Sequence, residues 1–387
     1  MNSLEKNNIP AGYKDSAVGV IPQEWEVRLL GDLCKNICSG NNKERNKNGK
    51  YRIYGSTGII GYSNTYSYNY PTILIARVGA NAGIINRGVG EYDVSDNTLI
   101  VCNNNIVYEY DFAYNQLTNY NLNKLVFGSG QPLVTAGQLK RIKLPIPPME
   151  EQRTIAEILG VWDEAIEKQS RLIEKLELRK RALMQRLLTG RTRLPGFTTP
   201  RQKVKLGEIF KERNETKREH LPLLSITAER GVILQSESDK KDTSNDDKSK
   251  YKRICPNDIG YNTMRMWQGR SALSAMEGIV SPAYTIVTPK AEVDPLFISE
   301  LIKQPRAVYD FWTHSQGLVG DTLNCKFHDF SQVKVAIPSL PEQKAIAEVL
   351  TTADDEIATH RKKLGALRLQ KRGLMQQLLT GKTRVKI

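Results

Sequence analysis

Hydrophobic residues recur at alternating steps of three and four along two long stretches of the chain. The first stretch follows the proline-rich segment at 144–150, the second follows a similar segment at 336–342, and both close with Thr-Gly. Helices commonly begin after proline and end at glycine, and this spacing is a heptad, so each stretch is expected to be one long helix with a coiled-coil seam. The expected seam positions are Ile155, Leu159, Trp162, Ile166, Ile173, Leu176, Leu183 and Leu187, then Ile346, Leu350, Ala353, Ile357, Leu364, Leu367, Leu374 and Leu378.

The second stretch repeats the first at a constant offset of 191 residues. IPPMEEQRTIAEIL (146–159) aligns with IPSLPEQKAIAEVL (337–350), and RALMQRLLTGRTR (181–193) aligns with RGLMQQLLTGKTR (372–384), without a gap. Repetition over this length indicates one structural unit used twice. A helix of about 40 residues would span about 60 Å, long enough to act as a spacer.

The two seams are interrupted by polar residues at matching positions. Gln169 corresponds to His360, and Lys180 to Lys371. Such interruptions cost stability but fix register, so we expect the helices to pair with each other, antiparallel, as a coiled coil. Two unrelated amphipathic helices lying on separate cores remain the alternative.

The sequence between the helices alternates in the manner of β-strands. Apolar runs at 71–79, 97–102, 283–289 and 332–338 are separated by Gly, Asn and Pro, and the polar run at 236–250 reads as a loop. Only the edges of the two globular parts resemble each other; their interiors do not. We therefore predict an α+β fold with a pseudo-two-fold repeat, in which two mostly β globular domains are separated by the two helices. The predicted parts are 1–146 (first globule), 147–193 (first helix), 194–337 (second globule) and 338–387 (second helix).

Composition narrows the class of partner. The 387 residues include 56 Lys and Arg against 42 Asp and Glu, a formal charge of +14, which favours a polyanion such as nucleic acid, although solvated surface cations would give the same count. There is no secretory signal and no apolar run of membrane-spanning length, so a cytoplasmic protein without a membrane partner is expected. The five scattered cysteines and four histidines lack metal-ligand spacing, so we expect reduced structural thiols and no metal.

Several motifs together resemble those of one known family. The repeated EQ-x-x-IA-x-x-L and LMQ-x-LLTG-x-TR signatures accompany GYKDSAVGVIPQEWEVRLLGDL (12–33), YGSTGIIGY (54–62) and FGSGQPLVTAGQLKRIKLPIPP (127–148). This combination is similar to the specificity (S) subunit of Type I restriction-modification systems, and it covers nearly the whole chain. The second globule departs from the pattern, with HSQGLVGDTLNCKFHDF (314–330) in place of the GSGQP segment.

The resemblance implies a function and partners. Each globule would be a target-recognition domain that reads one half of a bipartite, gapped site in double-stranded DNA, and the helices would fix the gap. Two DNA methyltransferase (M) subunits would dock on the helices. Motor-endonuclease (R) subunits would then join through the resulting M2S1 core, and all catalysis would belong to the partners.

Polar, amide-rich and basic loop residues are the candidate DNA contacts. Glycines allow close backbone approach, hydroxyls and amides bond to bases or phosphates, arginine suits guanine, and asparagine suits adenine. The YGSTGIIGY segment could instead be a plain β-turn; a phosphate-binding nucleotide loop is disfavoured because no Gly-Lys-Ser/Thr follows. An arginine in these stretches is also compatible with a surface charge or an ion pair. The candidates are Ser56, Thr57, Tyr62, Arg77, Asn81, Ser129 and Gln131 in the first globule, and Arg265, Trp267, Gln268, Arg270, Ser315 and Gln316 in the second.

Enzymatic interpretations have less support in the sequence. An adenine methyltransferase needs an Asn/Asp-Pro-Pro-Tyr/Phe loop and a glycine-rich cofactor turn, and neither is present. Glu342-Gln343-Lys344 resembles part of a metal-dependent nuclease site, but a carboxylate in the first turn of a helix is explained by the helix dipole. We therefore expect no catalytic residues and no cofactor. The alternative is the recognition part of another restriction-methylation enzyme whose catalytic domain is on a separate chain, or a nuclease with an unrecognised site.

Overall fold

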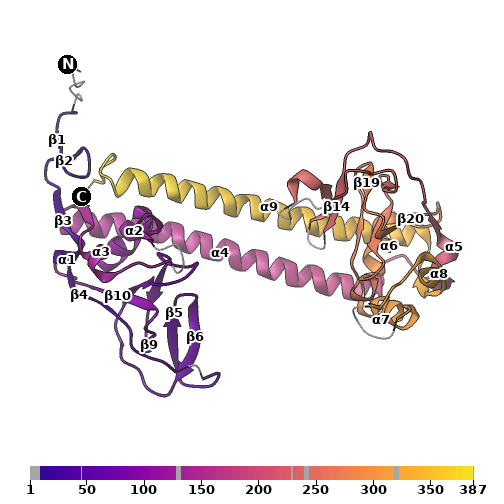
Figure 1. Ribbon diagram of the computed structural model, residues 1–387, viewed down its shortest axis with the longest axis horizontal. Coiled ribbons are helices and arrows are strands. Elements are labelled where there is room, and N and C mark those ends of the chain that lie inside the picture. Colours follow the sequence, from indigo (N-terminus) through magenta and orange to yellow (C-terminus); the bar gives the residue numbers. More distant parts are fainter. Residues whose placement is uncertain are drawn as a thin grey trace. The chain divides into compact units, whose positions relative to one another are not determined.

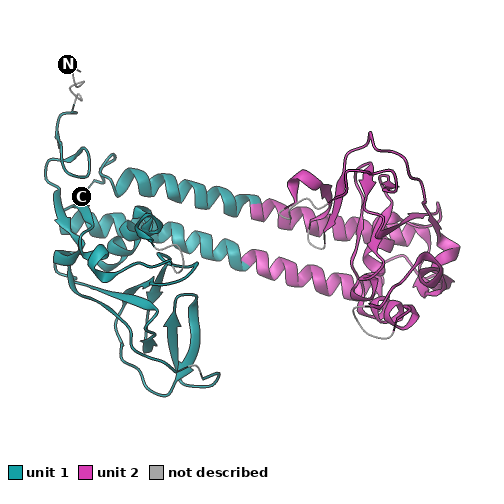
Figure 2. Cartoon of the chain, viewed as in Figure 1, with its two compact units in different colours: residues 1–171, 362–387 teal, residues 172–361 magenta. Residues whose placement is uncertain are grey.

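The computed structural model of the chain (Figure 1) contains two compact units. Unit 1 comprises residues 1–171 and 362–387, and unit 2 comprises residues 172–361 (Figure 2). Each unit therefore combines one globular part with a portion of both long helices. The structure describes residues 9–44, 46–127, 132–227, 230–238, 244–317 and 322–386.

Helices α4 (Met149–Leu188) and α9 (Leu340–Leu378) are the two predicted helices. Each is preceded by proline and ends before a glycine with positive φ, Gly190 at +74° and Gly381 at +73°, a conformation that side chains other than glycine rarely adopt. Acidic residues occupy the first turn of each, where they complement the positive end of the helix dipole.

Within each unit the two helices lie side by side and run antiparallel. In unit 2 the Nζ of Lys180 lies 2.6 Å from Oδ1 of Asp354, and Nη2 of Arg361 lies 2.6 Å from Oε1 of Glu177. Residue numbers thus rise along α4 as they fall along α9. In unit 1 the Nζ of Lys371 lies 2.6 Å from Oδ1 of Asp163, which is the same pairing as Lys180 with Asp354 shifted by 191 residues.

The apolar seam faces inward along both helices. The ends of the seam are also part of the globular cores: Ile155 and Leu159 belong to the core of unit 1, and Ile346 and Leu350 to that of unit 2. Each helix end is thereby fixed to a globule by burial of apolar surface. Ile155, Leu159, Ile173, Leu176, Leu187, Ile346, Leu350, Ile357 and Leu378 are buried, and Trp162, Ile166, Leu183, Ala353, Leu364, Leu367 and Leu374 are half-buried.

The globular part of unit 1 is built on an antiparallel sheet of order β4-β10-β7-β8. Both faces of the sheet are covered, because Ile73 and Ile75 pack into the main core while Leu74 packs against Tyr54 and Tyr92 of a smaller sheet, β6-β5-β9. Two-sided burial explains the uninterrupted apolar run of β7. The strands are β4 (Cys34–Ser39), β5 (Tyr51–Gly55), β6 (Gly58–Ser63), β7 (Thr72–Ala76), β8 (Ile85–Gly88), β9 (Tyr92–Val94) and β10 (Thr98–Asn103).

Unit 2 has a four-stranded antiparallel sheet of the corresponding order, β13-β20-β17-β18. Ile259 and Tyr261 face its main core, and Ile286 packs on the other side against Leu224 and Ile254, which belong to two small two-stranded sheets, β14-β15 and β16-β19. The strands are β13 (Phe210–Glu212), β14 (Leu224–Thr227), β15 (Gly231–Leu234), β16 (Lys252–Ile254), β17 (Ile259–Asn262), β18 (Ser271–Leu273), β19 (Gly278–Val280) and β20 (Tyr284–Pro289).

Shorter elements join the sheets to the long helices. A ladder of β3 with β11 in unit 1 corresponds to a ladder of β12 with β21 in unit 2. The bounds are β1 (Tyr13–Lys14), β2 (Ile21–Pro22), β3 (Glu26–Leu29), β11 (Lys143–Ile146), β12 (Gln202–Lys205), β21 (Lys334–Ile337), α1 (Leu30–Leu33), α2 (Tyr110–Tyr120), α3 (Ala136–Lys140), α5 (Leu206–Ile209), α6 (Pro295–Leu301), α7 (Pro305–His314), α8 (Phe327–Gln332), η1 (Leu122–Leu125), η2 (Gln235–Glu237) and η3 (Met266–Gln268).

The predicted α+β class is confirmed, with two globular parts, two long antiparallel helices and an internal repeat. Although the interiors of the two globules differ in sequence, both contain a four-stranded antiparallel sheet of corresponding strand order. The polar run at 236–250 begins within η2, and residues 239–243 lie outside the described residues. Among the residues that the structure describes, no helix is apolar over the length a membrane span requires.

Candidate nucleic-acid interface

Two loops meet in unit 1 at the residues between β7 and β8. Here the amide of Val134 donates to the carbonyl of Arg77 at 2.9 Å, and the amide of Gly79 donates to that of Pro132 at 2.9 Å. We call residues 77–84 together with 132–134 loop pair 1. It places the loop that carries Arg77 and Asn81 beside residues 132–134. The candidates Ser129 and Gln131 lie outside the described residues.

The same arrangement occurs in unit 2 with different side chains. The amide of Cys325 donates to the carbonyl of Thr263 at 2.9 Å, and Gln316 and Asn324 pair through two backbone bonds of 2.9 and 2.8 Å. We call residues 263–270 together with 322–325 loop pair 2. Leu133 and Val134 correspond to Asn324 and Cys325 at the offset of the long helices, so the two loop pairs are equivalent positions of one repeat.

The side chains of loop pair 1 are partly enclosed. Arg77 and Asn81 are half-buried, and the buried Nε of Arg77 has no hydrogen-bond partner among the described residues. The loop turns tightly at Gly79 and Gly83, both with positive φ. An arginine held in this way could donate its remaining N–H groups to an acceptor outside the chain.

Loop pair 2 exposes more of its polar side chains. Arg265, Gln268 and Arg270 are exposed, and the indole Nε1 of Trp267 donates to the carbonyl of Met264 at 3.0 Å.

Ser315 and Gln316 lie next to it but are already engaged. The Oγ of Ser315 donates to the carbonyl of Phe311 at 2.8 Å, and Nε2 of Gln316 donates to Oδ1 of Asp329 at 3.3 Å. These two side chains can still accept hydrogen bonds.

The remaining candidates of unit 1 belong to the smaller sheet. Ser56 and Thr57 form the turn between β5 and β6, and Gly58 follows with a φ of +94°. The β-turn alternative therefore describes their backbone. Tyr62 is 36% exposed on β6, where its ring is available for contact.

Sequence reasoning missed the buried glutamate at the start of each long helix and the arginine bonded to it. In unit 1, the carboxylate of Glu151 is fully buried and accepts from Nε of Arg384 at 2.7 Å and from Nε1 of Trp25 at 2.9 Å. We call these three residues clasp 1. Clasp 2 in unit 2 consists of Glu342, also fully buried, with Arg193 bonded to it and Nη2 of Arg201 at 4.0 Å.

The two clasps are equivalent by sequence and by strand register. Glu342 and Arg193 are related to Glu151 and Arg384 by the 191-residue offset. Trp25 precedes β3 as Arg201 precedes β12, and the two strands pair in the same register with their partners. The hydrogen bonds to the carboxylates raise the pKa of Arg193 and of Arg384, so both stay charged. The repeated Thr-Arg after each Thr-Gly was the available signal.

Each of these carboxylates is bonded to an arginine. Among the described residues, no group of three His, Cys, Asp or Glu side chains is placed to hold a metal ion. Burial raises the pKa of the Cys34 thiol to about 12 and that of Cys325 to about 12, which makes both poor nucleophiles at neutral pH.

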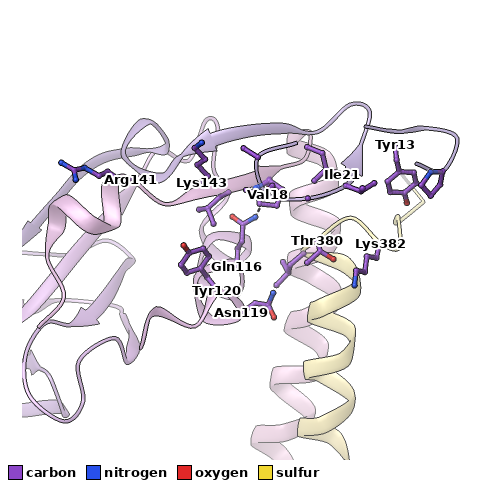
Figure 3. A pocket seen from close by; sticks show the side chains of 17 residues that line it. Tyr13, Val18, Ile21, Gln116, Asn119, Tyr120, Arg141, Lys143, Thr380 and Lys382 are labelled. Carbon is purple, nitrogen blue, oxygen red and sulfur yellow. Dashed lines mark hydrogen bonds between the residues drawn. The ribbon is translucent and has the colours of Figure 1, made fainter. Parts of the chain in front are cut away.

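Unit 1 also has a cavity of about 980 Å³ between its N-terminal segment, α2 and the end of α9 (Figure 3). Val18, Ile21 and Leu379 make part of its lining apolar, and Arg141 and Lys143 are among its cations. The described residues that line it include no acid, histidine or cysteine. The titratable side chains among these residues are those of tyrosine, lysine and arginine, so none of them supplies a carboxylate, imidazole or thiol.

Comparisons with known proteins agree with the repeat. The family described as "Type I restriction modification DNA specificity domain" matches residues 22–178 and 290–368. A Methanocaldococcus jannaschii protein, provisionally named the type I restriction enzyme MjaX specificity subunit, is 26% identical, and the alignment covers 97% of each chain.

Two solved structures share the fold. The S subunit of the M. genitalium Type I restriction-modification system superposes with a TM-score of 0.59 at 17% identity, covering 92% of this chain and 96% of that one. A chain from a study of "complex assembly" and conformational transition of the type I R-M system gives a TM-score of 0.57 at 16% identity, covering 94% and 99%. With more than half of its residues matched by the family pattern, this chain belongs to the family of specificity subunits of Type I restriction-modification systems.

Proposed function

We propose that loop pair 1 and loop pair 2 each read one half of a bipartite, gapped DNA sequence. The observation that carries this proposal is that the two loop pairs share one backbone arrangement but carry different side chains. Arg77 and Asn81 lie on loop pair 1, and Arg265 and Arg270 lie on loop pair 2. One frame used twice would approach the duplex in one way, whereas different side chains would select different bases.

The long helices supply the spacing in this proposal. A helix of 40 residues, the length of α4, extends about 60 Å at 1.5 Å per residue. Bases one turn apart on B-DNA lie about 34–36 Å apart, so helices of this length can carry two reading surfaces to separate half-sites. Lengthening α4 or the connector at 189–193 would then change the unread gap and leave the bases read unchanged.

The chain itself would be non-catalytic and act with partners. This part of the proposal is supported by the described residues that line the cavity of Figure 3, which include no acid, histidine or cysteine, and by the lack, among the described residues, of three His, Cys, Asp or Glu side chains placed to hold a metal ion. Two methyltransferase subunits would dock on the repeated helices, one for each repeat, and motor-endonuclease subunits would join that core. The likeness to a chain from a Type I complex supports this assignment of partners.

Mapping of methylated adenines across a genome tests the proposal. Cells would carry the partner methyltransferase with and without this chain, and a gapped motif present only with the chain is the expected result. Replacing residues 27–140 with those of a relative should alter one half of the motif and leave the other intact. If both halves change together, one unit does not read one half-site.

A further inference from the structure

Helix α7 of unit 2 presents an exposed aromatic pair that none of the predicted contacts includes. Tyr309 is 53% exposed and Trp312 is 50% exposed, and their ring centroids are 5.7 Å apart. Three residues apart on a helix, they share one face. The opposite face, with Ala307 and Phe311, is buried in the core. The aromatic pair is therefore not needed to fill the core of the unit.

This helix packs directly against loop pair 2. A side chain at Gly269, between Gln268 and Arg270, would come within 3.1 Å of Cγ2 of Val308. α7 ends at His314, and two residues later the backbone of Gln316 pairs with Asn324 of the loop pair. The aromatic pair is thus part of the same surface as the residues proposed to read DNA.

In unit 1 the corresponding segment, residues 109–127, is fully described and contains α2 and η1 but no second α-helix. The amides of Glu109 and Asp294 each donate to the glutamine that follows the clasp glutamate, Gln152 or Gln343, at 2.9 Å, so they mark the same point of the repeat. After this point, each unit reaches a residue that forms a β-bridge with its loop pair, Phe127 in unit 1 and Gln316 in unit 2. The distance along the chain is 18 residues in unit 1, from Glu109 to Phe127, and 22 residues in unit 2, from Asp294 to Gln316. The longer segment accommodates α7 where unit 1 has only η1.

The surroundings of the pair favour a polyanion. Arg265, Arg270 and Lys326 are exposed nearby on loop pair 2 and at the start of α8, and the side chain of Arg306 is 82% exposed. Asp310, the acid on α7, is paired with Arg306 at 3.2 Å. Aromatic rings beside cations are a common arrangement at nucleic-acid surfaces, where the rings cover sugars, base faces or thymine methyls and the cations neutralise phosphates.

We propose that Tyr309 and Trp312 form an apolar DNA contact specific to the second half-site, placed at the edge of the bases that loop pair 2 reads. This inference rests on the proposed function and adds to it an element, α7, that has no counterpart among residues 109–127 of unit 1. The rings contribute affinity by excluding water from an apolar part of the duplex, without neutralising phosphate charge. They should therefore affect binding strength and leave its salt dependence unchanged.

The test uses the full-length chain purified with its methyltransferase partner and a duplex that carries the mapped gapped motif. We expect the Tyr309→Ala/Trp312→Ala variant to bind this duplex about tenfold more weakly, with the slope of log affinity against log salt unchanged. Substituting base pairs at the edge of the second half-motif should then weaken the variant less than the wild type. Substitutions in the first half-motif should weaken both equally.

Ile106→Ala is the control, because Ile106 is 83% exposed in unit 1, outside the proposed contact, both loop pairs and both long helices. Its DNA affinity should stay within twofold of the wild type. The inference is overturned if the aromatic variant binds DNA like this control, or if it loses methyltransferase instead, which would make the surface a protein-docking site. If the wild type itself shows no gapped preference, the proposed function fails as well.

Discussion

The buried carboxylate of clasp 1 allows a quantitative prediction about Arg384→Ala. The substitution removes the cation and leaves Glu151, fully buried, with one neutral donor, the indole Nε1 of Trp25 at 2.9 Å. Removing one partner of a buried ion pair costs about 3–5 kcal/mol. The side chain of Arg384 is 34% exposed, so water already screens part of this pairing and will hydrate part of the freed carboxylate. We therefore expect a loss of about 2 kcal/mol in the free energy of unfolding of unit 1.

A second substitution separates charge from packing. Glu151→Gln keeps an acceptor for Trp25 but carries no charge, so combining it with Arg384→Ala should restore part of the lost stability. The corresponding change in clasp 2, Arg193→Ala, should cost less than Arg384→Ala, because Arg201 remains 4.0 Å from Glu342 as a second cation.

Thermal and urea unfolding of the purified variants provide the measurement. Unit 1 contains 197 residues, 171 and 26 from its two segments, and for that size about 2 kcal/mol corresponds to a Tm decrease of about 4–8 °C. Hydrogen exchange at the start of α4 should rise in parallel. An Arg384→Ala protein as stable as the wild type, or one that Glu151→Gln destabilises further, would refute the view that the carboxylate is held by charge.

Three further predictions concern the long helices and a thiol. Leu176→Ala, at a buried seam position with 8% exposure, should lower the free energy of unfolding by about 2–4 kcal/mol in urea unfolding, whereas Leu178→Ala, two residues away and 58% exposed, should change it by less than about 0.5 kcal/mol. The double variant Lys180→Asp/Asp354→Lys should lower the free energy of unfolding by less than about 1 kcal/mol, and by less than the sum of the two single substitutions. Additive effects in this double-mutant cycle would contradict the pairing. Cys34, whose pKa burial raises to about 12, should resist iodoacetamide at pH 8 in the folded chain and react after denaturation, as peptide mass mapping can show; rapid native labelling would contradict its burial.

The long helices could be predicted from sequence because their signal is local and sustained. A heptad pattern that continues over some forty residues, with proline before it and glycine after it, leaves little room for another element. The paired partner also followed from sequence, since both seams carry interruptions at corresponding positions. The ion pair of Lys180 with Asp354 could not be named in advance, because its two residues are 174 positions apart.

The repeated sheet could not be predicted because strand pairing is non-local. The apolar runs at 71–79 and 283–289 were identified as strands, but nothing in them states that β7 lies beside β10 or that β17 lies beside β20. A buried strand needs only apolar residues of suitable shape, so two equivalent strands can share a place without sharing sequence.

The candidate site was predicted in part. Composition identified the glycine- and arginine-rich loops, and the structure brings Arg77 beside the segment at 132–134. The sequence did not identify Trp25 as a partner of a buried carboxylate. A tryptophan is typical of a protein core, and the residue that its indole bonds, Glu151, is 126 positions away. Tyr309 and Trp312 were missed for a related reason: helical periodicity separates buried from exposed positions only when the core side of the helix is known.

The clasps have a consequence for chains that contain only one of the two repeats. Each buried glutamate is neutralised by an arginine that follows the other long helix, Glu151 by Arg384 and Glu342 by Arg193. A product ending just after Arg193 would carry both a glutamate lacking its counterion and an arginine lacking its acceptor. Two such molecules could exchange these groups reciprocally and form a symmetric dimer.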